Sequence, residues 1–138
     1  MAETLHLRVV TPERLLFDEE VDEVTAPGAE GEFGVLPNHT TFLSSLQPGR
    51  FLYKHGGQTH VMAVSGGFAE VVNNTVTVLT DSAELASAIN VERARAALQK
   101  ATEVLRTLTP PDPSFAETQA AFQRAQARLQ IAGEGHHS

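Results

Sequence analysis

The chain has 138 residues, 41% of them hydrophobic, which is enough for one compact domain or for one domain with a small appendage. It contains no cysteine, which excludes disulfides and cysteine-based metal sites and favours a reducing compartment. Seventeen acidic residues against ten basic residues give a formal net charge of -7, which disfavours binding to nucleic acid or to anionic lipid.

Met1 to Val10 alternates apolar and polar side chains, without the basic start and continuous apolar run of a signal peptide. This alternation predicts a first strand, which Thr11-Pro12 ends. Val21 to Ala26 is a second β-prone run, and Pro27-Gly28 closes it. The acidic run from Asp18 to Glu23 is typical of a solvated strand edge.

Two tight hairpins are predicted further along. The expected strands are Arg50 to His55 and Gln58 to Val64, then Phe68 to Val72 and Thr75 to Thr80. Gly56-Gly57 and Asn73-Asn74 connect them, and both dipeptides tolerate the positive φ angles of a type I′ turn. Short strands at this spacing usually pack as a sandwich or barrel.

After Asp81 the spacing of apolar residues lengthens from two to about 3.5, which predicts helices. Two stripes share this spacing: Val91, Ala94, Leu98, Ala101, Leu105 and Leu108; then Phe115, Thr118, Phe122, Ala125, Leu129 and Ala132. The prolines of Thr109 to Pro113 separate them, so the prediction is an antiparallel helical hairpin.

The predicted helix ends are marked by capping residues. Asn90 is the expected N-cap of the first helix, and Ser114 with Glu117 forms a capping box for the second. Gly133 and Gly135 are expected to end the second helix before His136-His137. Because alanines bury little area, the hairpin needs a docking surface, and either a conformational switch or a static appendage fits this pattern.

No catalytic or metal-binding residue is predicted. The histidines lack ligand spacing, Ser65 is not in a G-x-S-x-G elbow, and Gly66-Gly67 is not followed by the Lys-Ser/Thr of a phosphate loop. A bulge or a close backbone approach is the simpler interpretation of these glycines. The segment Glu30 to His39 has two interpretations: a turn that leads into a short strand, or an exposed loop that presents Glu32 and His39, where partner contacts concentrate.

The order of several motifs resembles the epsilon subunit of bacterial F-type ATP synthase over nearly the whole chain. In the first half these are Val9-Val10-Thr11-Pro12, Glu30 to His39, Ser65 to Val71 and Asn74 to Leu79. In the second half they are Ile89-Asn90-Val91-Glu92-Arg93-Ala94 and Arg124 to Leu129.

This resemblance implies an α+β fold, with a ten-stranded β-sandwich head in residues 1–86 and an antiparallel two-helix regulatory hairpin in residues 87–138. It implies a non-catalytic rotor subunit of the central stalk, coupling c-ring rotation to the catalytic head. Glu32 would face the c-ring, and His39 would face the gamma subunit. Such a chain lies at the cytoplasmic face of the bacterial inner membrane, held there only through the complex.

In this family the hairpin regulates ATP hydrolysis by changing between a folded form and an extended form that reaches the catalytic alpha and beta subunits. Some members bind regulatory ATP on the folded hairpin without hydrolysing it, and no other cofactor is implied. The matching residues are Glu84, Asn90, Arg93, Arg124 and Arg128. Because Asn90 stands where the motif has aspartate, the resemblance leaves ATP binding open. The alternative function is a stand-alone β-sandwich adaptor with a partner-binding helical hairpin.

Overall fold

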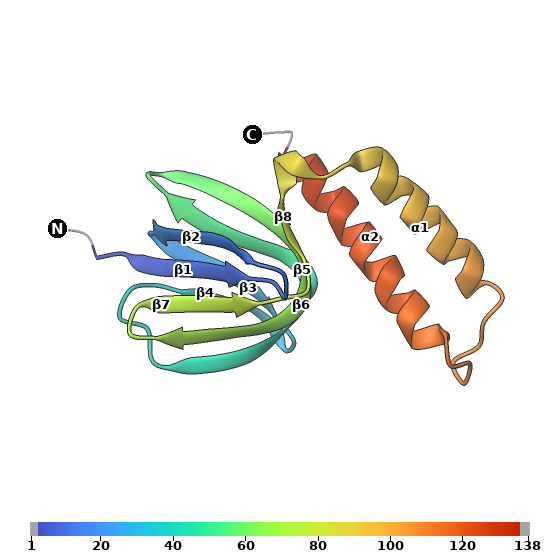
Figure 1. Cartoon of the computed structure of the whole chain (residues 1–138), viewed down its shortest axis with the longest axis horizontal. Helices are drawn as coiled ribbons and strands as arrows, with labels where there is room; N and C mark the ends of the chain where they lie inside the picture. The colour runs from blue at the N-terminus through green and yellow to red at the C-terminus, as the bar shows by residue number, and fades with distance from the viewer. Residues whose placement is uncertain (1–2, 136–138) are drawn as a thin grey trace.

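The computed structural model describes residues 3–135, with side chains as far as Gly133, and shows a β-sheet domain followed by two helices (Figure 1). The strands are β1 (Leu5–Val10), β2 (Leu15–Val21), β3 (Glu23–Gly28), β4 (Gly31–Val35), β5 (Phe42–His55), β6 (Gln58–Val72), β7 (Thr75–Leu79) and β8 (Ala83–Leu85). The helices are the short η1 (Ala86–Ala88), then α1 (Val91–Leu105) and α2 (Phe115–Gly135). The expected α+β class is confirmed.

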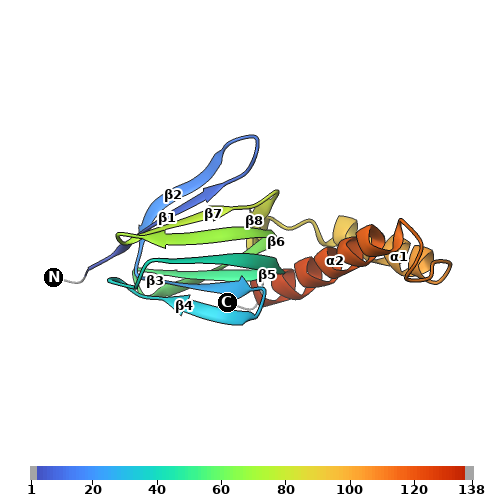
Figure 2. The same cartoon turned by 90° about the horizontal axis from the view of Figure 1, so that it is seen from below.

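The strands form one hydrogen-bonded sheet in the order β2-β1-β7-β6-β5-β3-β4, and β8 pairs with β6 beyond the end of β7. Figure 2 shows the sheet folded over, so that β1, β2 and β7 form one layer and β3 and β4 lie in the other. Leu5, Leu7 and Val9 alternate with outward side chains along β1 and are fully buried with Phe51 between the layers.

Both predicted hairpin turns are confirmed. Gly56 and Gly57 have φ angles of 58° and 81°, and Asn73 and Asn74 have φ angles of 49° and 61°. Positive φ at two successive positions is the signature of a type I′ turn, which matches the twist of the flanking strands. These turns fix the registers of β5 with β6 and of β6 with β7.

The sheet has eight strands within residues 3–135, not the ten that the resemblance implied. The chain was expected to break near Ser65, but β6 runs through it for 15 residues, and its partner β5 has 14. Gly66 and Gly67 have φ angles of 106° and 116°, which let the strand bend sharply without ending. A Cβ on Gly67 would lie 1.9 Å from the carbonyl oxygen of Leu79, so the expected close backbone approach is confirmed.

The N-terminal strands differ from the prediction in two further ways. Leu15–Val21 forms the edge strand β2, which was not predicted as a strand, and its outward carboxylates make it the expected solvated edge. The run from Val21 to Ala26 is divided at Asp22 between β2 and β3, and Pro27-Gly28 continues β3 instead of closing it.

The helical hairpin agrees with the predicted stripes, whose members are all buried or half-buried. The first helix ends at Leu105, before Leu108, and the second continues through Gly133 instead of ending there. His136 and His137 lie outside the described residues. Neither helix, as far as residue 135, is long and apolar enough to cross a membrane.

Candidate functional site

The junction between sheet and hairpin is built on the face of α2 that lies toward the sheet (Figure 1). Ile131 and Ala132 are buried there against Ala63 of β6 and against Ala86 and Ile89 of the connecting segment. Helix α1 lies on the far side and packs mainly on α2. The sheet therefore holds the hairpin through one small apolar cluster, in which three of these five residues are alanines.

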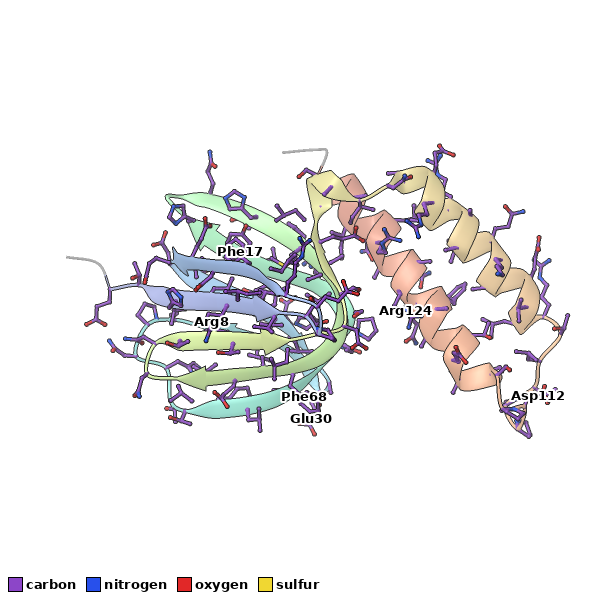
Figure 3. All side chains as sticks on the ribbon, in the orientation of Figure 1. Arg8, Phe17, Glu30, Phe68, Asp112 and Arg124 are labelled. Carbon is purple, nitrogen blue, oxygen red and sulfur yellow. The ribbon has the colours of Figure 1, made fainter. Side chains whose placement is uncertain are left out.

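An ion pair adds to this junction. The guanidinium Nε of Arg128 donates to Oε1 of Glu84, joining α2 to β8, and both side chains are about 30% exposed. Glu84, Arg124 and Arg128 line one hollow of about 30 Å³ beside Ala63 and Ser65. Figure 3 shows Arg124 on the side of α2 that faces the sheet. Three of the five residues named for nucleotide binding are therefore brought together.

Asn90 and Arg93 lie at the start of α1 and do not line that hollow. The side-chain Oδ1 of Asn90 accepts a hydrogen bond from the Arg93 backbone N–H at 3.0 Å, which confirms the predicted N-cap. The Arg93 side chain is exposed. The hollow has a volume of only about 30 Å³ in the folded form, with Asn90 and Arg93 outside it.

Glu32 and His39 lie at opposite ends of β4. Glu32 is exposed on the strand itself, opposite Pro27, so of the two interpretations the turn into a short strand is confirmed and the loop placement of Glu32 is not. His39 is half-buried in the loop that follows β4, and its Nδ1 donates to the carbonyl oxygen of Thr40 at 2.7 Å. The imidazole ring lies 6.0 Å from the ring of Phe42. The two predicted contact residues thus do not form one site.

The outer face of β5, β6 and β7 carries an apolar surface that the sequence analysis did not single out. Leu43, Phe68 and Leu79 are 67%, 55% and 51% exposed. On β6, Phe68 is paired with Leu79 of β7 on one side and with Ser45 of β5 on the other. Ser45 is two residues from Leu43, so the two side chains lie on the same face of β5. We call these three residues the outer apolar surface. Alternation along β6 was the available signal, since Ala69 and Val71 point inward and Phe68 therefore points outward.

A pocket of about 410 Å³ borders this surface and is lined by Phe68, Leu79, Thr11, Pro12 and Gly67 among others. It lies where β1 and β7 end, and a hydrogen bond from Thr80 N–H to the Val10 carbonyl joins the two chain segments there. The turn between β3 and β4 is nearby, because the Ala29 N–H donates to the Ser45 carbonyl at 2.9 Å. Figure 3 shows Glu30 and Phe68 at this same corner.

No group of three or more metal-ligating side chains occurs among the residues that the structure describes. His6 contacts Asp18 and Glu20 across the β1–β2 pair, with 3.2 Å between its Nδ1 and Oε1 of Glu20. Hydrogen bonds to Glu20 and then to Asp18 raise the pKa of His6 above its ordinary value.

Comparisons with known proteins cover both parts of the chain. Residues 4–86 match the family described as ATP synthase, Delta/Epsilon chain, beta-sandwich domain, and residues 87–133 match its long alpha-helix domain. The ATP synthase epsilon chain of Geobacter sp. (strain M21) is 51% identical over 134 residues, which is 97% of each chain. That of Nitratidesulfovibrio vulgaris (strain DP4) is 51% identical over 133 residues, 96% of this chain and 98% of the relative.

Solved structures show the same architecture. A chain in the Euglena gracilis mitochondrial ATP synthase, from the OSCP/F1/c-ring assembly, has a TM-score of 0.79 and 26% identity, covering 94% of this chain and 81% of that one. A chain of the Tetrahymena thermophila mitochondrial central stalk and c-ring has a TM-score of 0.56 at 14% identity, covering 96% of both, which supports the fold alone.

Proposed function

Because the chain belongs to the delta/epsilon family of ATP synthase subunits, as a non-catalytic epsilon chain of the central stalk, we propose that its head docks on the gamma subunit through the outer apolar surface. The exposure of Leu43, Phe68 and Leu79 carries this proposal. Isolated apolar side chains on a surface are ordinary, but a contiguous group beside a pocket of about 410 Å³ is typical of an interface.

Co-purification with gamma tests the docking surface. Phe68→Glu places a charge in the middle of the outer apolar surface and is expected to weaken gamma binding by about tenfold or more. Leu85→Glu is the matched control, since Leu85 is 41% exposed on β8, which pairs with β6 at Met62 to Val64, on the other side of the bend at Gly66 and Gly67 from Phe68. Equal recovery of gamma with both variants would contradict the docking surface, whereas no recovery of gamma with the unmodified chain would favour the stand-alone adaptor.

We further propose that the turn between β3 and β4, with Glu32 beside it, meets polar loops of the c-ring. Glu32 is exposed, so any ion pair it forms there is screened and worth about 0 to 1 kcal/mol. Glu32→Lys is expected to weaken proton-coupled synthesis while sparing hydrolysis by the detached catalytic head. Unchanged coupling would reject this role. In this proposal the chain stays at the cytoplasmic face of the inner membrane through its partners.

For the hairpin we propose regulation of ATP hydrolysis, with the folded form alternating with an extended form that contacts the alpha and beta subunits. The small cluster around Ile131 and the half-buried Glu84–Arg128 pair support this, because an apolar contact area of this size is a weak attachment for the hairpin. Truncation after Asn90 is expected to raise hydrolysis by the assembled enzyme. An unchanged rate in the truncated enzyme would refute inhibition.

Regulatory ATP is the last proposal for this junction. Arginine side chains suit phosphate oxygens, but Arg128 is engaged by Glu84 in the folded form, so a nucleotide requires that pair to open. Asn90→Asp restores the carboxylate of the family motif while keeping the N-cap, and we expect it to tighten ATP binding by about tenfold. Calorimetric titration of both proteins tests this, and no heat from either at millimolar ATP counts against the site.

A further inference from the structure

A further pocket lies beside β8, between β2 and the part of β6 that pairs with β8. Its volume is about 280 Å³, and Leu16, Phe17, Met62, Leu85 and Ala88 supply most of its apolar wall. Met62 is 2% exposed and Leu85 is 41% exposed, so the pocket runs from the core of the sandwich to solvent. Its walls come from β2, β6, β8 and η1.

A β-bulge shapes the wall on β2. Val9 is paired with Phe17 and Val10 with Leu15, so Leu16 is an extra residue that has no partner on β1. Side chains of consecutive strand residues normally point to opposite faces. Here both Leu16 and Phe17 line the pocket, which is the effect of a bulge that redirects a side chain.

The space beside β8 exists because β1 stops early. Strands β7 and β8 follow one another along β6, and β1 pairs with β7 only as far as Val10 opposite Leu79. The chain then turns back into β2, so that within residues 3–135 no strand pairs with the second edge of β8.

The charges at the pocket are unequal. Arg14 is exposed at its edge, and no carboxylate in the described part of the chain forms an ion pair with its guanidinium. Glu84 also lines the pocket, but its charge is compensated by Arg128. An apolar cavity with one uncompensated cation complements a molecule that has an apolar body and a single negative charge.

We propose that this pocket binds a small amphipathic carboxylate, with its hydrocarbon body against Leu16, Phe17 and Met62 and its carboxylate on Arg14. A volume of about 280 Å³ is just below the range of drug-sized sites, so a ligand of about ten non-hydrogen atoms fits best. Octanoate has this size and charge, and a ligand so small is expected to bind at roughly 0.1 to 1 mM. The site is separate from the proposed gamma and c-ring surfaces.

The test is an NMR titration of the full-length chain with octanoate below its micelle concentration. Shifts are expected in the amide signals of β2, β8 and η1, with those of the β3–β4 turn unchanged. Arg14→Gln is expected to weaken octanoate binding about fivefold to tenfold and to leave the binding of octanol, which has the same tail without the charge, unchanged. Ala88→Phe fills the pocket and is expected to abolish the binding of both.

Arg14 and Ala88 are both exposed, so neither variant disturbs the core of the sandwich. Three results would overturn the proposal: shifts spread over the whole surface, octanoate binding that Arg14→Gln leaves unaltered, or binding of both ligands that persists in Ala88→Phe. Spread shifts, or binding that persists in Ala88→Phe, mean an adventitious additive only. Binding that Arg14→Gln leaves unaltered means that Arg14 does not bind the carboxylate.

Discussion

Replacing Ile131 with alanine is expected to release the hairpin from the sheet without unfolding the head. Ile131 is 2% exposed, and its neighbours Ala63, Ala86 and Ile89 belong to the small cluster at the junction and not to the sandwich core. Truncating a buried isoleucine to alanine costs about 2 to 4 kcal/mol. Since about 1.4 kcal/mol is a factor of ten, the undocked fraction is expected to rise roughly 30-fold to 700-fold.

Amide hydrogen exchange measures this equilibrium segment by segment. In Ile131→Ala, protection is expected to fall in α1, α2 and η1 and to remain at wild-type level in β1, β6 and β7. The control is Val9→Ala, which removes apolar volume from a fully buried position in the sandwich and is expected to lower protection throughout the head. If Ile131→Ala lowers protection equally in head and hairpin, the two parts unfold as one unit and the reasoning fails.

Three further predictions concern local features of the fold. Gly67→Ala is expected to lower the free energy of unfolding by more than about 3 kcal/mol, because the new Cβ would lie 1.9 Å from the Leu79 carbonyl oxygen. Gly57→Ala has open space and should lower it by only about 1 kcal/mol, through backbone strain. Similar urea midpoints for the two variants would contradict this. Asn90→Ala removes the side-chain acceptor for the Arg93 N–H and is expected to destabilise α1 by about 1 kcal/mol, seen as faster exchange in its first turn and contradicted by unchanged exchange there. The pKa of His6 in the folded chain is above its ordinary value of 6.5, so its contribution to stability is full below about pH 6.5 and is lost as the pH rises through the folded pKa. His6→Gln should therefore destabilise the chain at about pH 6 but not at about pH 8. An equal effect at both pH values would refute this prediction.

Features that depend on neighbouring residues were predictable from the sequence. The turns at Gly56-Gly57 and Asn73-Asn74 follow from tolerance of positive φ, and the N-cap at Asn90 follows from its side-chain acceptor and the helical stripe behind it. Each feature depends on residues within about four positions of one another, so the local sequence pattern is enough to predict it. The two helical stripes were predictable for the same reason.

Features that depend on contacts between distant parts of the chain could not be predicted from the sequence. Strand β2 was missed because the bulge at Leu16 interrupts the alternation of its side chains. The sequence pattern did not show that β6 continues through Gly66 and Gly67, because the reason is the approach of Leu79 from β7. Glu84 and Arg128 are 44 residues apart, and only the fold brings them together.

The difference between local and distant contacts also bears on what happens when the hairpin moves. The bond from the Arg93 N–H to Asn90 lies within α1, so it persists wherever the hairpin goes. The Glu84–Arg128 pair joins β8 to α2 and must break, together with the contacts of Ile131. An ion pair with about 30% exposure contributes little energy but has a defined geometry. The pair would therefore determine the position in which α2 docks, and burial of Ile131 would determine the free energy of docking. Glu84→Gln should therefore alter the docked position more than the docked population, and Ile131→Ala should do the reverse.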